Sequence, residues 1–158
     1  MKLLIFTEGT ILMHKSGKNC TRKQRVKQVK EREKSVFDYN SYIPIGKAEN
    51  ILNRWQKQGI KIIYLTSRTK PVEIKQIKRI LAKYKFPKGK LAFRKKGQKY
   101  KDVAEKQLPD ILIEDDCESI GGKKQMTYTY INPQIKKKIK LISVKEFRGI
   151  DHLSNVLV

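Results

Sequence analysis

ILIEDD, residues 111–116, is the stretch that decides how this chain folds, because three branched apolar residues are followed at once by three acids. A short apolar run of this kind predicts a buried strand that ends where the acids begin. The chain has 158 residues and a formal net charge of +22, yet five of its fifteen acids lie between Asp110 and Glu118. Like charges repel, so such a cluster usually surrounds a cation or hydrogen-bond donors. Mg²⁺ is the natural candidate.

Strands and helices alternate on the amino-terminal side of this stretch. Short apolar runs predict strands at residues 2–7, 60–65 and 90–93, before the one at 110–113. Helical spacing of apolar residues predicts helices between them, at residues 48–58, from Pro71 to Tyr84, and at 100–108. This alternation predicts an α/β fold: one domain over residues 1–158, with a parallel sheet covered by helices on both faces.

Two segments lie outside the alternation. Residues from about 14 to 40 form a basic insert, and residues 21–34 within it are helix-permissive but carry only two interior apolar side chains. The insert is either a small cap that contacts phosphate or a plain exposed charged helix. Residues from about 123 to 158 form a C-terminal extension, with further strands predicted at 126–131 and 141–144.

Composition and charge limit the location and the partners of the protein. No apolar run is long enough to span a bilayer, and the run at residues 3–6 is too short for a signal peptide, so we expect a cytoplasmic protein without a membrane partner. Cys20 and Cys117 are too few for a disulfide framework and lack the spacing of a zinc site. The 37 Lys and Arg residues indicate either a nucleic-acid-binding surface or a solvated lysine-rich exterior.

The residues just beyond the predicted strands form one candidate site, because ligands of open parallel sheets bind at the carboxyl ends of the strands. Carboxylates suit a metal ion, and hydroxyls with a lysine suit a phosphate. The set comprises residues 7–10, 66–68 and 114–116, together with Lys99 and Lys101 at the start of a predicted helix.

In this order, the motifs resemble those of the haloacid dehalogenase superfamily, most of whose members are Mg²⁺-dependent phosphatases with a Rossmann-like core. LLIFTEGT (3–10) is similar to the first motif of the family, YLTSR (64–68) to the second, and ILIEDD (111–116) to the fourth. The resemblance implies a three-layer Rossmann-like fold. It also implies roles for individual residues: phosphate binding by Thr66, Ser67 and Lys101 (or Lys99), and Mg²⁺ binding by Glu8, Asp115 and Asp116, with Glu8 as the general acid/base.

The first motif departs from the family pattern at the nucleophile. In the register fixed by Gly9 and Thr10, the nucleophilic Asp of the family falls on Phe6; in a loop one residue shorter, it falls on Thr7. Neither register supplies the carboxylate that would form a phospho-aspartyl intermediate. We therefore expect a divergent member that binds Mg²⁺ and a phosphorylated small molecule or nucleic-acid end, without Asp-nucleophile phosphatase activity.

Two alternatives to this function remain open. A metal-bound water, with Glu8 as its base, could hydrolyse a phosphomonoester directly. The fold could instead serve as a nucleic-acid-binding module whose affinity falls steeply with salt.

Individual residues also have plainer interpretations. Residues 114–116 could form a solvated turn, and Thr66 and Ser67 could cap the following helix. Arg68 could pair with the acids or contact a substrate phosphate. We expect His14 and His152 to be ordinary surface or loop residues. Cys117 is expected to be structural, with a pKa raised by the adjacent acids.

Overall fold

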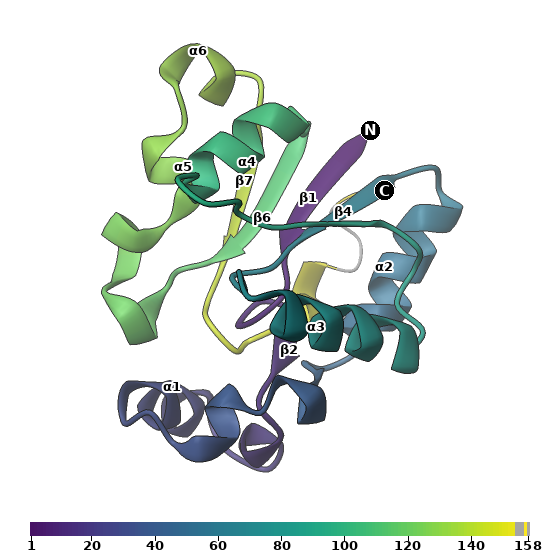
Figure 1. Cartoon of the computed structure of the whole chain (residues 1–158). Coiled ribbons are helices and arrows are strands. Elements are labelled where there is room, and N and C mark those ends of the chain that lie inside the picture. Colours follow the sequence, from purple (N-terminus) through teal and green to yellow (C-terminus); the bar gives the residue numbers. More distant parts are fainter. Residues whose placement is uncertain (154–156, 158) are drawn as a thin grey trace.

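A five-stranded parallel sheet forms the centre of the structure, a computed structural model that describes residues 1–153 and 157. The strand order is β5-β4-β1-β6-β7 (Figure 1). The strands are β1 Lys2–Phe6, β4 Lys61–Leu65, β5 Lys90–Ala92, β6 Ile111–Asp115 and β7 Lys140–Val144. Because all neighbours pair in parallel, the five carboxyl ends lie at the same edge of the sheet. The predicted α/β Rossmann-like fold is confirmed.

Helices cover both faces of the sheet because successive side chains of each strand point to opposite sides. Along β1, Leu3 and Ile5 belong to one buried cluster, with Trp55, and Leu4 belongs to a second cluster, with Ala104. The first cluster contains side chains of α2 Ala48–Lys57 and α3 Pro71–Lys83. On the other face lie α4 Tyr100–Gln107, α5 Thr127–Tyr130 and α6 Pro133–Lys136 (Figure 1).

The basic insert lies beyond the carboxyl edge of the sheet (Figure 1). Its first and last segments, β2 Leu12–Met13 and β3 Ile43–Pro44, pair antiparallel, so the chain leaves and re-enters the core at one place. Between them lie η1 Lys15–Gly17, α1 Arg22–Lys30, η2 Lys34–Phe37 and η3 Tyr39–Ser41. Thr21 and Gln24 start α1 with a reciprocal capping box, which offsets the small apolar area that this helix buries.

The C-terminal extension corrects one prediction. Residues 126–131, predicted as a strand, contain the short helix α5. The buried Glu114 carboxylate accepts hydrogen bonds from the backbone N–H groups of Thr127 and Tyr128, both at 2.8 Å, and so satisfies the first turn of α5. The sheet position beside β6 is taken by β7 instead. The remaining short turns are η4 Glu118–Ile120, η5 Gly122–Gln125 and η6 Asp151–Leu153.

None of the helices in the described part of the chain is both long and apolar enough to cross a bilayer.

Candidate metal and phosphate site

The carboxyl edge of the sheet opens into a cavity of about 370 Å³. Four strands contribute to its wall, either from their last residues or from the loops that follow them. The insert and the turns η4 and η5 supply further wall residues. The strand-end contributions are Phe6, Glu8, Ser67, Arg68, Glu114, Asp115 and Glu146.

At the end of β1, the side chain that faces the cavity is Phe6. Its ring packs edge-on against Tyr100, with the ring centroids 5.5 Å apart. Thr7 is fully buried, and its hydroxyl contacts the Leu65 carbonyl oxygen at 3.3 Å and the Glu8 carboxylate. Of the two positions considered for the nucleophile, the one that faces the cavity therefore carries a phenyl ring.

Three carboxylates gather where β6 and β7 end. Oxygen atoms of Asp115, Asp116 and Glu146 lie within 4.8 Å of one another, the one such group of metal-ligating side chains among the described residues. The Glu146 backbone N–H donates to Asp116 Oδ1 at 3.1 Å, and this bond joins the two strand ends directly. Gly9 is required beside this group, because a Cβ at its position would lie 3.0 Å from Asp115 Oδ2 and its φ of +82° favours glycine.

Hydrogen bonds orient the two most buried members of this cluster. Asp115 accepts from the Thr10 hydroxyl and from the Cys117 backbone N–H, both at 2.9 Å. Glu146 accepts from the Ser119 hydroxyl at 2.6 Å and from the Ser119 backbone N–H at 2.7 Å. These donors fix the carboxylates in place but leave them as acceptors close to one another.

Burial makes both carboxylates costly as anions. Burial raises the pKa of Asp115 to about 6, and the charges of Glu114 and Asp116 add to the shift. Burial likewise raises the pKa of Glu146 to about 7, with Asp115 and Asp116 contributing. A divalent cation would reverse this effect, since it stabilises the charged forms.

The donor set fits Mg²⁺. It consists of hard carboxylate oxygens from three side chains, and Mg²⁺ commonly takes a few carboxylates and keeps several waters. Asp115, Asp116 and Glu146 would hold the ion, which would supply a positive charge at the cavity wall.

Glu8 lies in a different environment from the one expected for a ligand of that ion. Its carboxylate accepts from the Thr66 hydroxyl at 2.6 Å and from the Ser67 backbone N–H at 3.3 Å, and it pairs with Arg68 Nε at 3.4 Å. Together with the Thr7 hydroxyl, these donors surround the Glu8 carboxylate. We call Thr66, Ser67 and Arg68 the anion cradle. The structure brings Asp115 and Asp116 together. The Glu8 carboxylate instead occupies the anion cradle.

Arg68 therefore pairs with Glu8 and not with the acids at residues 114–116. Its guanidinium also lies over the Tyr39 ring, 4.5 Å from the centroid, and contacts the Tyr39 hydroxyl. Tyr39 belongs to the insert, so Arg68 links the insert to the strand ends.

The two candidate phosphate-binding lysines flank a residue that lines the cavity. Tyr100, in the first turn of α4, contributes to the wall, whereas Lys99 and Lys101 do not. Adjacent residues of a helix project about 100° apart. Because the Tyr100 side chain faces the cavity, the Lys101 side chain points in a different direction. Arg94 lies over the Tyr100 ring at 4.0 Å and brings a cationic group to this side.

Glu146 is absent from the site predicted from the sequence, although the sequence carries a signal for it. It follows β7 by two residues, and a strand was predicted at 141–144. The rule that ligands collect beyond strand ends applies to this strand as well. The sequence pattern places this strand in a C-terminal extension outside the alternating strands and helices, so the predicted site does not include its end.

Two further predictions have clear outcomes. His14 is fully buried rather than a surface residue; it contacts Gln28 Oε1 at 2.7 Å and packs edge-on against Phe147, and burial lowers its pKa. The pKa of Cys117 is raised, first by burial and then by the charge of Asp115, as expected of a structural thiol. Cys20 and Cys117 are both free.

Glu114 has a structural role that can be separated from the metal cluster by mutation. Glu114→Gln keeps the size of the side chain but turns an NH₂ group toward one of the two backbone donors of α5. We expect the free energy of unfolding to fall by about 1–3 kcal/mol, the cost of leaving a buried donor unpaired. Urea denaturation measures this loss, and the folded variant should still bind Mg²⁺, because Glu114 is not one of the three clustered carboxylates. A variant as stable as wild type would contradict the assignment.

The topology, the first-motif loop and the acidic strand end define an α/β domain of the haloacid dehalogenase type. The family model described as "PITM 1-3, LNS2 domain" matches residues 11–114, more than half of the chain. The chain therefore belongs to the LNS2 domain family. The matched region begins after Glu8 and ends before Asp115. Comparison of the sequence with curated proteins gives no significant match.

Solved structures of two other proteins share this fold. The class C acid phosphatase from Bacillus anthracis with tungstate bound has a TM-score of 0.58 at 11% identity, over 99% of this chain and 71% of that chain. A chain of the Pnkp1/Rnl/Hen1 RNA repair complex has a TM-score of 0.55 at 13% identity, over 91% of this chain. The present chain spans 43% of that RNA repair chain. At these identities, the likeness shows the fold alone.

Proposed function

We propose that this LNS2-family domain binds Mg²⁺ and a phosphorylated ligand without the turnover of an Asp-nucleophile phosphatase. The observation that carries the proposal is the pairing of two complementary subsites at the carboxyl edge of the sheet, each with residues that line the cavity. Asp115, Asp116 and Glu146 offer oxygens to a cation, and the anion cradle offers a hydroxyl, a backbone N–H and a guanidinium to an anion. A phosphomonoester beside Mg²⁺ matches both.

Glu8 is the internal occupant that such a ligand has to displace. A phosphate entering the cradle would take over the donors that Glu8 uses, and the displaced carboxylate would then be available to the cation. The adjacent Gly9 already lies against Asp115, so Glu8 remains in the proposal as a metal ligand in the phosphate-bound state. Mg²⁺ and phosphate should accordingly bind cooperatively. Lys101 stays in the proposal as an additional phosphate contact at the first turn of α4.

The environment of Glu8 favours binding over hydrolysis by a metal-bound water. A general base must present a free lone pair to the water that it activates. Without phosphate, the Glu8 carboxylate is engaged by Thr66, Ser67, Arg68 and Thr7. In the phosphate-bound state of this proposal it is a ligand of the cation, so in neither state is it free to serve as a base. The RNA repair complex and the acid phosphatase that share the fold support a phosphorylated ligand as the class to test first.

The direct test is calorimetric titration of the protein with inorganic phosphate, with and without Mg²⁺, alongside phosphate release from a panel of phosphomonoesters. We expect phosphate affinity to rise with Mg²⁺ and no release above the protein-free control. Mg²⁺-dependent release that is abolished by Asp115→Asn would establish the hydrolase instead. Absence of phosphate binding under both conditions would overturn the proposal.

Removing the internal occupant should expose the cradle. In Glu8→Ala without Mg²⁺, we expect phosphate to bind about tenfold more tightly than in wild type, a gain of about 1.4 kcal/mol from lost competition. Glu8→Gln is the matched control, because its amide still fills the space and should give a smaller gain. Titration calorimetry gives both affinities. Weaker phosphate binding in Glu8→Ala would mean that Glu8 assists the anion rather than competing with it.

A further inference from the structure

The insert gives the cavity an aromatic and apolar wall that faces the charged strand ends. Val29, Val36, Phe37 and Tyr39 all contribute to this wall, although a phosphate and a cation need none of them. Phe37 is 45% exposed, an unusual position for a large apolar side chain at the edge of a polar site. The wall therefore indicates that the ligand carries a flat or apolar part beside its phosphate.

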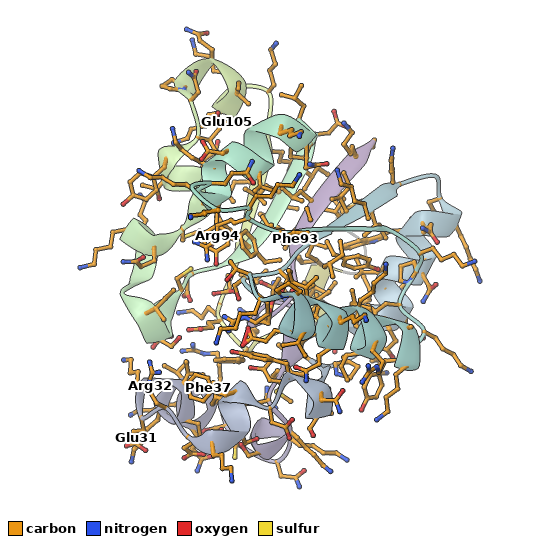
Figure 2. All side chains as sticks on the ribbon, in the orientation of Figure 1. Glu31, Arg32, Phe37, Phe93, Arg94 and Glu105 are labelled. Carbon is orange, nitrogen blue, oxygen red and sulfur yellow. The ribbon has the colours of Figure 1, made fainter. Side chains whose placement is uncertain are left out.

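Arginine side chains lie over aromatic rings on both sides of the cavity. Arg32 lies 5.1 Å from the centroid of the Phe37 ring, and Arg94 lies 4.0 Å from that of Tyr100. Figure 2 shows Arg32 and Phe37 on the insert, and Phe93 and Arg94 on the loop after β5, on the other side of the strand ends. Guanidinium planes and aromatic rings are the two protein surfaces on which nucleobases stack.

Exposed basic residues surround these pairs on elements at and around the cavity. They lie in the insert, in the loop after β5 and in η5, and include Lys30, Lys34, Lys95, Lys96, Lys123 and Lys124. Such a distribution attracts a polyanion that extends beyond the cavity, more than a small monoester that fits inside it.

On the basis of the proposed function, we propose that the phosphorylated ligand is the terminal nucleotide of a single-stranded nucleic acid, and that its base stacks on Phe37. The terminal phosphate lies in the anion cradle, the base lies against the insert, and the following phosphates run over the basic residues. A nucleic acid fits better than a membrane surface, because guanidinium groups lie over one face of the Phe37, Tyr39 and Tyr100 rings. A charged cover opposes insertion of a ring into hydrocarbon but not stacking on a base.

The test is fluorescence anisotropy with short oligonucleotides that carry a 3′-phosphate, a 5′-phosphate or no terminal phosphate, in the presence of Mg²⁺. We expect one phosphorylated end to bind at least about tenfold more tightly than the unphosphorylated oligonucleotide. In Phe37→Ala, that affinity should fall about tenfold, the loss typical of one stacked base, while calorimetric binding of inorganic phosphate stays at the wild-type value. Val72→Ala is the matched control, because Val72 on α3 is also exposed but lies outside the cavity wall.

Each other outcome overturns a different statement. Equal binding of all three oligonucleotides, falling steeply with salt, would mean attraction by charge alone and would remove the terminal nucleotide as ligand. Binding of inorganic phosphate without any oligonucleotide binding would leave the proposed function standing and overturn this inference. Binding to phosphatidylcholine vesicles containing phosphatidate, whose headgroup is also a phosphomonoester, without oligonucleotide binding would replace the nucleic acid by a membrane surface. Failure of phosphate itself to bind would overturn the proposed function first.

Discussion

Asp115→Asn is expected to abolish the stabilisation of the protein by Mg²⁺. Asp115 lies at the carboxyl end of β6 and is one of the three clustered carboxylates, with two hydrogen bonds that orient it. At a concentration of one hundred times Kd, a ligand stabilises the folded state by about 2.7 kcal/mol, and this gain should disappear in the variant. Thermal unfolding of both proteins across a Mg²⁺ series measures the difference.

The metal-free variant should show an opposite change. Burial and the neighbouring acids raise the pKa of Asp115 to about 6, so its anion is disfavoured in the folded protein near neutral pH. Asn carries no charge and can still accept from the Cys117 N–H, so without Mg²⁺ the variant should unfold at a higher temperature than wild type. Higher stability without Mg²⁺ and no gain with Mg²⁺ together distinguish a lost metal ligand from a damaged fold. A normal Mg²⁺ response in Asp115→Asn would remove the metal site from this strand end.

Phe6→Asp is expected to introduce phosphate release into the domain. Phe6 faces the cavity, and the register fixed by Gly9 and Thr10 places the nucleophilic carboxylate of the resembled family at this position. If the nucleophile is the missing component, an Asp there supplies the carboxylate for a phospho-enzyme intermediate. Release of p-nitrophenol from p-nitrophenyl phosphate should then become detectable and depend on Mg²⁺, against a wild-type rate at background.

Phe6→Asn is the matched control for this gain. It removes the same ring and its contact with Tyr100 and has nearly the same shape as Asp, but it lacks the nucleophilic oxygen. Activity in Phe6→Asp that is absent from Phe6→Asn and from the Phe6→Asp, Asp115→Asn double variant would assign the loss of turnover to a single residue. Equal background rates in all three folded proteins would show that further elements of the catalytic site have diverged.

The sequence predicts the sheet well because its strands are buried on both faces. Such strands are short continuous apolar runs, and residues 2–6, 61–65 and 111–113 could hardly be anything else between amphipathic helices. The prediction for residues 126–131 is wrong because alternating Thr and Tyr, taken locally, are typical of a strand. Their helix depends on the Glu114 carboxylate, a contact that no local pattern encodes.

The candidate site is predictable as a list of strand ends but not as a set of contacts. The positions of Asp115 and Asp116 at a strand end can be predicted from the apolar run before them. The position of Glu8 does not, since the loop around Gly9 directs its carboxylate toward Thr66 and Arg68 instead of toward the acids. The direction of the Lys101 side chain depends on the residue at which a short helix begins. A sequence prediction with uncertain helix boundaries cannot fix that residue. Predicting Glu146 as a site residue would require placing β7 in the central sheet, beside β6.

The tethered carboxylate of Glu8 has a consequence for selectivity among anions. Because Glu8 is covalently attached beside the cradle, it competes at a high effective concentration that does not vary with the surroundings. Chloride and monocarboxylates, each with a single negative charge, offer the cradle little that Glu8 does not already provide. A phosphomonoester dianion brings a second charge and a third oxygen, so it can displace Glu8 where abundant monoanions cannot. The cavity would thus remain closed to common anions without a moving lid.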